Sequence, residues 1–285
     1  TSFGTGNVNG GLTPVESTLT LTPGTPFSVT VGSGGAGMIN STTQTAYGYQ
    51  GVKGEDSIFN TITSTGGGGG GTMGASPYQD VSAKGGTGGS GGGSGFRNGP
   101  TGTGSAATPY NASPVQGFIG GGNLNYTPGY STGGGGGAGG IGGPGGPNPA
   151  NGSGGLGLEN AITGTNSFYA GGGGGSTYKN SYAAPGSGGS GIGGNGGGAY
   201  YQVSGVGGNG AANTGSGGGG GNAAAGSVAK AGGSGGDGVV ILRYPSNYST
   251  TKSGIISSVD STSVSGFIIE TVTSGTGTIT FAITP

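Results

Sequence analysis

The chain has 285 residues, of which 85 are Gly, and it carries seven Lys or Arg against eight Asp or Glu, for a formal net charge of −1. Its hydrophobic content of 28% is too low for a conventional apolar core across the whole length. Scattered single cations exclude a basic nucleic-acid-binding face, and the lack of Cys and His removes thiolate metal sites and the commonest catalytic bases, so we expect no cofactor.

Membrane insertion is not expected either. No apolar run approaches the roughly 20 residues that span a bilayer. Thr1 begins without an initiator Met or a signal sequence. We interpret it as a processed end or a fragment boundary.

The first region, residues 1–65, combines turns with β-patterned segments. Leu19–Leu21 and Phe27–Val31 both alternate apolar and polar residues, and a Pro-Gly turn separates them. This pattern predicts a β-hairpin. Ser57–Ile62 predicts a further short strand.

The middle region, residues 66–238, contains runs in which Gly recurs in threes. From Gly133 to Pro147 the sequence reads as Gly-Gly-X triplets, with X being Gly135, Ala138, Ile141, Pro144 and Pro147. The pattern returns at residues 85–93, 188–197 and 231–237. A three-residue period matches the left-handed extended helix, which rises about 3.1 Å per residue. The runs therefore predict helices of the polyglycine II type.

Such a helix makes no internal hydrogen bonds, so it must pair with neighbours when it is buried. Faces made only of Gly let adjacent helices approach closely enough to bond backbone to backbone. X residues are then expected on the outer surface or at helix ends. Because ordering Gly costs about as much free energy as the hydrogen bonds return, we expect the β-patterned ends to clamp the lattice.

Two other structures have to be weighed for this composition. A Gly- and Ser-rich sequence is also typical of a flexible linker, and composition alone leaves that alternative open. Collagen needs an unbroken Gly-X-Y repeat with about 15 to 20% Pro. The chain has 14 Pro and a period that keeps breaking, so collagen is excluded.

The third region, residues 239–285, is again β-patterned. Val239–Tyr244 reads as a buried strand after an Asp-Gly turn, and Phe267–Val272 is expected to pair with Thr278–Ile283 across residues 274–277. No segment shows a capped helical period. We therefore expect a non-α fold of packed polyglycine II helices flanked by short antiparallel strands at both ends, with almost no α-helix.

The order of these elements resembles a known family. The resemblance rests on Leu21–Gly37, on Gly54–Phe59, on the Gly runs and most specifically on the closing segment Gly232–Tyr244. Together they are similar to the glycine-rich domain of bacteriophage tail-fibre and other surface proteins, over about residues 19–244. The resemblance implies a polyglycine sandwich whose connecting loops contact a host receptor, as in tail-fibre tip adhesins.

The segments between the Gly runs are enriched in Tyr, Asn and Thr, which is the composition of adaptable recognition surfaces. The alternative is that these rings cap helix ends or bury a subunit contact. The candidate receptor-binding residues are Tyr110, Tyr126, Tyr130, Phe168, Tyr169, Tyr178, Tyr182, Tyr200 and Tyr201.

Catalysis is not expected, because the nearest carboxylate pair, Glu55-Asp56, consists of neighbours that point to opposite faces of an extended chain. We expect a structural and receptor-binding component of a phage tail fibre or similar virion surface, a homo-oligomer located on the virion or outside the cell. Its partners would be a host cell-surface glycan or outer-membrane protein and other fibre subunits. The alternatives are a self-assembling extracellular filament or coat subunit and an ice-binding protein.

Overall fold

The computed structural model describes residues 19–38, 50–72, 83–95, 115–123, 130–146, 152–178, 184–200, 203–222 and 230–284. The strands are β1 (Pro26–Thr30), β2 (Ser57–Phe59), β3 (Ile62–Ser64), β4 (Tyr130–Ser131), β5 (Leu158–Asn160), β6 (Ser167–Tyr169), β7 (Thr177–Tyr178), β8 (Ala199–Tyr200), β9 (Val203–Ser204), β10 (Val240–Pro245), β11 (Tyr248–Asp260) and β12 (Phe267–Ile283). A single 3₁₀ turn, η1 (Gly189–Gly191), is the sole helical element within these ranges. The expected non-α fold is confirmed.

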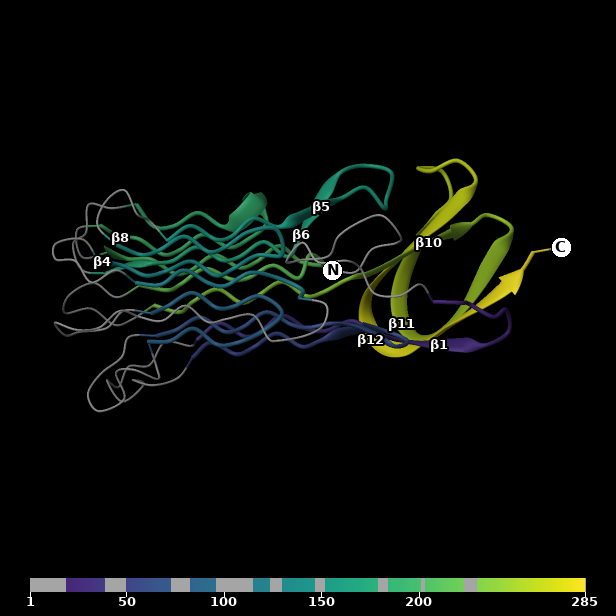
Figure 1. Cartoon of the computed structure of the whole chain (residues 1–285), viewed down its shortest axis with the longest axis horizontal. Helices are drawn as coiled ribbons and strands as arrows, with labels where there is room; N and C mark the ends of the chain where they lie inside the picture. The colour runs from purple at the N-terminus through teal and green to yellow at the C-terminus, as the bar shows by residue number, and fades with distance from the viewer. Residues whose placement is uncertain are drawn as a thin grey trace.

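Both ends of the chain contribute to one antiparallel sheet. The long strand β12 pairs with β11 along one side, and with β10 and then β1 along the other, while β2 and β3 extend the sheet beyond β1. Figure 1 shows this sheet at one end of the molecule, with the glycine-rich runs lying side by side along the long axis from it. The predicted division at residues 65 and 239 thus separates segments that share a sheet.

The strand predictions were partly wrong. The Pro-Gly turn forms, with the Thr25 N–H donating to the Thr22 carbonyl at 3.1 Å, but Leu19–Leu21 is not a strand. β1 instead pairs with β12 and β2, because these strands present the apolar partners that bury Phe27 and Val29. No hairpin forms between Leu19–Leu21 and Phe27–Val31.

Two further expectations are corrected. Ser57–Ile62 is not one strand but a β2–β3 hairpin, which turns at Asn60 with a φ of 53°, a left-handed value that Asn tolerates. Phe267–Val272 and Thr278–Ile283 do not pair with each other, because they are two halves of β12. The partner of both is β11, which the sequence pattern did not predict. The predicted strand at Val239–Tyr244 is confirmed as β10.

The apolar core is small and lies in this sheet. It consists of buried side chains from β1, β10 and β12, with ring contacts such as Tyr244 against Phe281 at 5.2 Å between centroids and 86° between planes. Edge-to-face ring pairs of this kind are favourable beyond the area they bury. The members of the core are Phe27, Val29, Tyr244, Val272, Ile279 and Phe281.

A fully buried carboxylate lies beside this core. Glu270 Oε2 accepts hydrogen bonds from Thr250 Oγ1 at 2.7 Å and Tyr244 OH at 3.2 Å, and Oε1 accepts from Ser257 Oγ at 2.8 Å. The Lys252 ammonium lies 2.9 Å from Oε1. Burial raises the pKa of Glu270, but the hydrogen bonds and the Lys252 charge outweigh burial, and the net pKa is lowered.

This shift predicts an acid-sensitive sheet. Because the folded-state pKa lies below the ordinary 4.5, ionised Glu270 stabilises the fold above that pH, and the contribution is lost as pH falls through the lowered pKa. Urea unfolding followed from neutral pH to about pH 3 should show stability falling over that window. The variant Glu270→Gln should flatten the profile there, and an unchanged slope would contradict the assignment.

The glycine-rich runs are joined by backbone hydrogen bonds that repeat every three residues. Gly217 N–H donates to the Gly171 carbonyl at 2.8 Å, and Gly220 N–H donates to the Gly174 carbonyl at 2.9 Å. A β ladder repeats every two residues, whereas a helix with three residues per turn presents the same face at every third. Gly188 has φ −67° and ψ 146°, close to the extended-helix values. For the other runs the polyglycine II geometry stays a prediction.

Glycine is required where the runs touch. A Cβ built on Gly173 would lie 1.9 Å from the Gly218 carbonyl oxygen, and one on Gly233 would lie 1.9 Å from the Gly208 carbonyl oxygen. Side chains are therefore excluded from these contacts, and the backbones bond directly.

The X positions of the Gly133–Pro147 run do not all face outward. Ile141 is 63% exposed and Pro144 is exposed, as expected, but Ala138 is 2% exposed. The Ala138 N–H donates to the Ala170 carbonyl, so this position faces another run rather than solvent. Pro147 lies outside the described residues.

Eight of the runs form a closed ring. Each one donates or accepts backbone hydrogen bonds with the next, from the first run round to the last and back to the first. In order around the ring they are residues 32–38, 51–57, 64–72, 90–95, 132–136, 169–177, 214–222 and 230–239. The ring joins segments from the start and the end of the chain, so the lattice closes only when the whole domain is folded.

Candidate functional site

Two short strand pairs lie at the end of the molecule far from the main sheet. β4 pairs with β7, which sets Tyr130 directly opposite Tyr178, and β8 pairs with β9, which sets Tyr200 opposite Val203. Figure 1 shows β4 and β8 close together at this end. We call these four strands the distal strand pairs. They bring three of the predicted binding residues to one end.

The base of the distal strand pairs is held by buried polar groups. Ser131 Oγ donates to the Gly146 carbonyl at 2.9 Å and accepts from the Gly146 N–H at 2.8 Å, and Ser131 is fully buried. Asn222 Nδ2 donates to the hydroxyl of buried Thr177 at 3.3 Å. These contacts tie β4 and β7 to neighbouring runs, which gives the end a rigid support.

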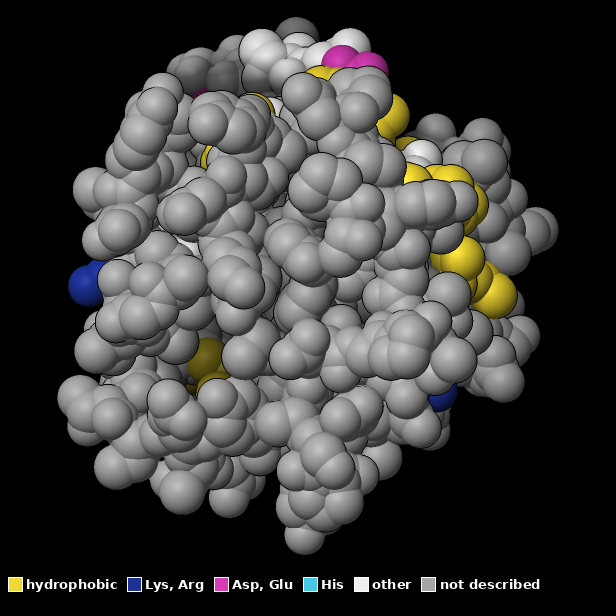
Figure 2. All heavy atoms as spheres, turned by 90° about the vertical axis from the view of Figure 1, so that its left-hand side faces the viewer, with side chains coloured by type: hydrophobic (Ala, Val, Ile, Leu, Met, Phe, Trp, Pro, Cys, Tyr) yellow, Lys and Arg dark blue, Asp and Glu magenta, His cyan; other side chains and the backbone are white. Residues whose placement is uncertain are grey.

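Few side chains of the described residues are visible in a view onto this end. Figure 2 looks directly at it and shows scattered single charged side chains and hydrophobic side chains toward one edge.

The remaining predicted residues are not all gathered there. Phe168 and Tyr169 lie in β6, whose hairpin with β5 is nearer the main sheet. The hairpin tip packs on the β11–β12 turn, since a Cβ on Gly164 would meet Ser263 and Val264 at 3.0 Å. Tyr110, Tyr126, Tyr182 and Tyr201 lie outside the described residues.

Phe168 and Tyr169 have different environments within β6. Phe168 is 41% exposed, whereas Tyr169 is half-buried and burial raises the pKa of its hydroxyl, against a smaller opposing effect of the hydrogen bond from Ser167. Tyr169 also lines the space inside the ring of runs. Of the two, Phe168 is available to a partner and Tyr169 serves packing.

An apolar outer face was not among the predicted sites, although Ile141 was expected to face outward. Ile119, Ile141 and Leu156 are 41%, 63% and 60% exposed. Their runs are neighbours, because Gly142 donates to the Ile119 carbonyl and Gly139 donates to the Leu156 carbonyl. We call these three residues the apolar flank. Large aliphatic residues inside a Gly run are the sequence signal for such a face. The contacts between runs leave no room for their side chains, so these side chains must point outward.

Three acidic residues near the ring of runs, Glu55, Asp56 and Asp237, have structural partners. Glu55 Oε2 accepts from Ser33 Oγ at 2.8 Å, and Asp56 Oδ1 accepts from the Gly66 N–H at 2.9 Å. Asp237 Oδ1 accepts from the Gly34 N–H at 2.8 Å, which ties the last run of the ring to the first. These carboxylates thus connect the β-patterned ends to the lattice.

Two further features are absent from the described residues. No group of three or more His, Cys, Asp or Glu side chains lies close enough to hold a metal ion. Within the same residues there is no helix with the length and apolar character needed to cross a membrane.

Comparison with known proteins gives a family. No curated protein and no solved structure was found to match the chain. The family model of the glycine-rich domain matches residues 1–245, which is most of the chain and ends at the last residue of β10. The chain therefore belongs to the glycine-rich domain family.

Proposed function

We propose that the chain is a structural and receptor-binding component of a phage tail fibre or a similar virion surface. In this proposal polyglycine II helices form a rigid scaffold, and the segments at its distal end attach to a host cell-surface glycan or outer-membrane protein. The observation that carries it is the gathering of the distal strand pairs, with Tyr130, Tyr178 and Tyr200, at the end opposite the main sheet. The virion or extracellular location belongs to the same proposal.

The physical reason is that a hydrogen-bonded scaffold can hold recognition segments without a large apolar core. Aromatic rings on such a support lose little freedom on binding, so more of their contact energy appears as affinity. A glycan partner would be recognised by stacking on such rings and by neutral hydrogen bonds.

Binding to bacterial cells tests this proposal. In a labelled-protein adsorption assay over a panel of bacteria, the double variant Tyr130→Ala/Tyr178→Ala should bind the recognised cells about tenfold or more weakly, because central aromatic anchors dominate such interfaces. The matched control is Phe168→Ala, since Phe168 is exposed but lies away from the distal end. Equal binding by the double variant and the wild type would refute receptor binding at this end.

A second candidate is a self-assembling extracellular filament or coat subunit. Two observations favour it. The apolar flank exposes three large aliphatic side chains, and β11, 13 residues long, pairs only with β12 among the described strands, so its other edge is open to another chain. Electron microscopy with mass measurement over a concentration series separates the two. Open-ended filaments would support the filament subunit, and discrete particles would support the fibre component.

A further inference from the structure

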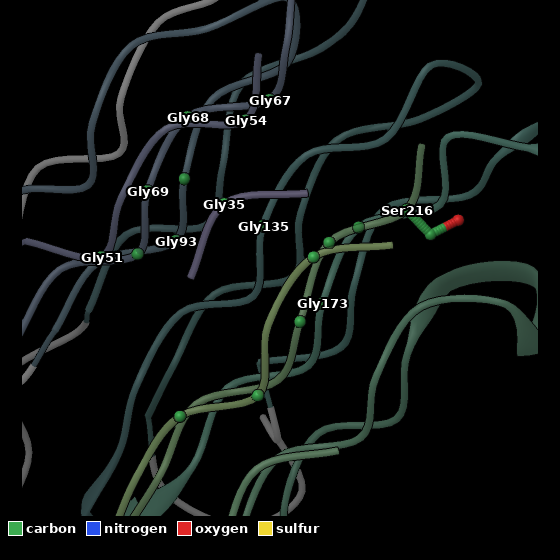
Figure 3. A pocket seen from close by; sticks show the side chains of 18 of the residues that line it. Gly35, Gly51, Gly54, Gly67, Gly68, Gly69, Gly93, Gly135, Gly173 and Ser216 are labelled. Atoms are coloured by element: carbon green, nitrogen blue, oxygen red, sulfur yellow. The ribbon is translucent and has the colours of Figure 1, made fainter. Parts of the chain in front are cut away.

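The ring of runs encloses a cavity. Its volume is about 740 Å³, and every residue that lines it belongs to one of the eight runs of the ring. Figure 3 shows Gly35, Gly67 and Gly93 on one side of the space and Gly173 and Ser216 on the other. The walls are mostly bare backbone, because the lining residues are mostly Gly.

The cavity has the shape that would remain if neighbouring runs were left out of the lattice. In a close-packed array of parallel rods, a ring of this size surrounds two adjacent vacant positions. A conventional core would fill such a space with side chains, and a Gly lining supplies none. The vacancy therefore matches the cross-section of further extended chains.

The lining runs also contain backbone N–H groups that have no acceptor among the described residues. In the run 64–72, Gly68 and Gly71 donate to the next run of the ring, whereas the N–H groups of Gly67, Gly69 and Gly70 donate to no residue of the described part of the chain. Gly67 and Gly70 are three residues apart. The same is true of Ser90 with Gly93 and of Gly218 with Gly221, each pair lying in a run that lines the cavity.

Two side chains that line the cavity also carry polar atoms without a hydrogen-bond partner among the described residues. Ser94 and Asn222 line the cavity and are each 2% exposed, and Ser94 Oγ and Asn222 Oδ1 have no hydrogen-bond partner among the described residues. Buried polar groups of this kind are rare in folded proteins, because an unpaired group costs free energy. Donors and acceptors together therefore line a space with almost no side chains of its own.

We infer that the cavity is a slot for an extended glycine-rich peptide segment supplied by another protein chain. Such a segment presents N–H and C=O groups every third residue on each face, which is the spacing within the Gly67–Gly70, Ser90–Gly93 and Gly218–Gly221 pairs of the wall. It also lacks the side chains that the narrow Gly contacts exclude. The inserted segment completes the lattice from within, so that two subunits become linked by backbone hydrogen bonds.

A peptide-binding measurement tests this slot. The probe is a fluorescent peptide with the sequence of residues 66–71, which are all Gly, and solubilising Lys residues at its ends, and the readout is fluorescence anisotropy with the full chain. We expect saturable binding. A control peptide with Val at every second Gly should not bind, because its side chains meet the wall.

Two variants locate the binding. Gly70 lines the cavity and a Cβ there meets nothing within 4 Å, so Gly70→Leu fills the slot without straining the fold and should weaken binding about tenfold or more. Ser94→Ala removes an unpaired hydroxyl and should weaken binding several-fold while leaving thermal unfolding unchanged. Absence of saturable binding, or binding that Gly70→Leu leaves unchanged, would overturn the inference and indicate a cavity filled by solvent. Neither result depends on the distal strand pairs.

Discussion

Replacing Gly173 with Ala is expected to lower the free energy of unfolding by about 1 to 3 kcal/mol or more. The added methyl group would lie 1.9 Å from the Gly218 carbonyl oxygen, so the two runs must separate. Gly173 also accepts a hydrogen bond from Gly135 in the run on its other side, so a shift of the Gly173 run disturbs that contact as well. Urea or thermal unfolding of the full chain measures the change.

Gly70→Ala is the matched control. The same methyl group is added to a run of the same ring, but at a position where a Cβ meets nothing within 4 Å. The substitution should leave stability unchanged or raise it by about 0.4 to 1 kcal/mol, because Ala restricts the unfolded chain. Equal destabilisation by the two variants would mean that loss of Gly flexibility, and not contact between runs, determines the effect.

Replacing Lys252 with Met is expected to cost about 2 to 3 kcal/mol of unfolding free energy, because it leaves the buried Glu270 carboxylate without its counter-charge. The hydroxyls of Thr250 and Ser257 continue to donate to Glu270, which keeps the loss moderate. Denaturant unfolding at neutral pH measures it.

The control for this variant is Lys53→Met. Lys53 forms an ion pair of similar length with Asp56, at 2.8 Å, but both side chains are about 40% exposed to solvent, at 44% and 39%. Exposed pairs contribute about 0 to 1 kcal/mol, so little change is expected. In addition, the double variant Lys252→Met/Glu270→Gln should recover part of the loss. If it is less stable than Lys252→Met alone, the pairing is not the source of the effect.

The candidate site was predictable only in part. Enrichment of Tyr between Gly runs pointed to Tyr130, Tyr178 and Tyr200, and the structure brings their strands to one end. The same enrichment included Phe168 and Tyr169, whose hairpin lies beside the main sheet. Composition indicates which segments connect the Gly runs. It does not indicate whether a connecting segment lies at the distal end or beside the main sheet, because that depends on where each run ends.

The cavity and its unpaired groups had no signal in the sequence. Gly67 and Gly68 are adjacent and identical in type, yet one donates to no described residue and the other donates to Ser90. Their roles differ because successive N–H groups along these runs point toward different neighbours, as the three-residue repeat of the hydrogen bonds shows. Whether a neighbouring run lies in the direction of a given N–H group is decided only when the ring is assembled.

The sequence by itself determined that the fold is non-α, that Gly runs with a period of three form its centre, and that β-patterned ends accompany them. These features follow from local physics, since Gly removes the side chains a core would need and leaves the backbone to make the contacts. Only the tertiary structure decided that both ends share one sheet, that Glu270 is buried within it, and that eight runs close into a ring. Gly runs carry almost no side chains to specify a partner, so their neighbours are chosen by how the whole chain closes.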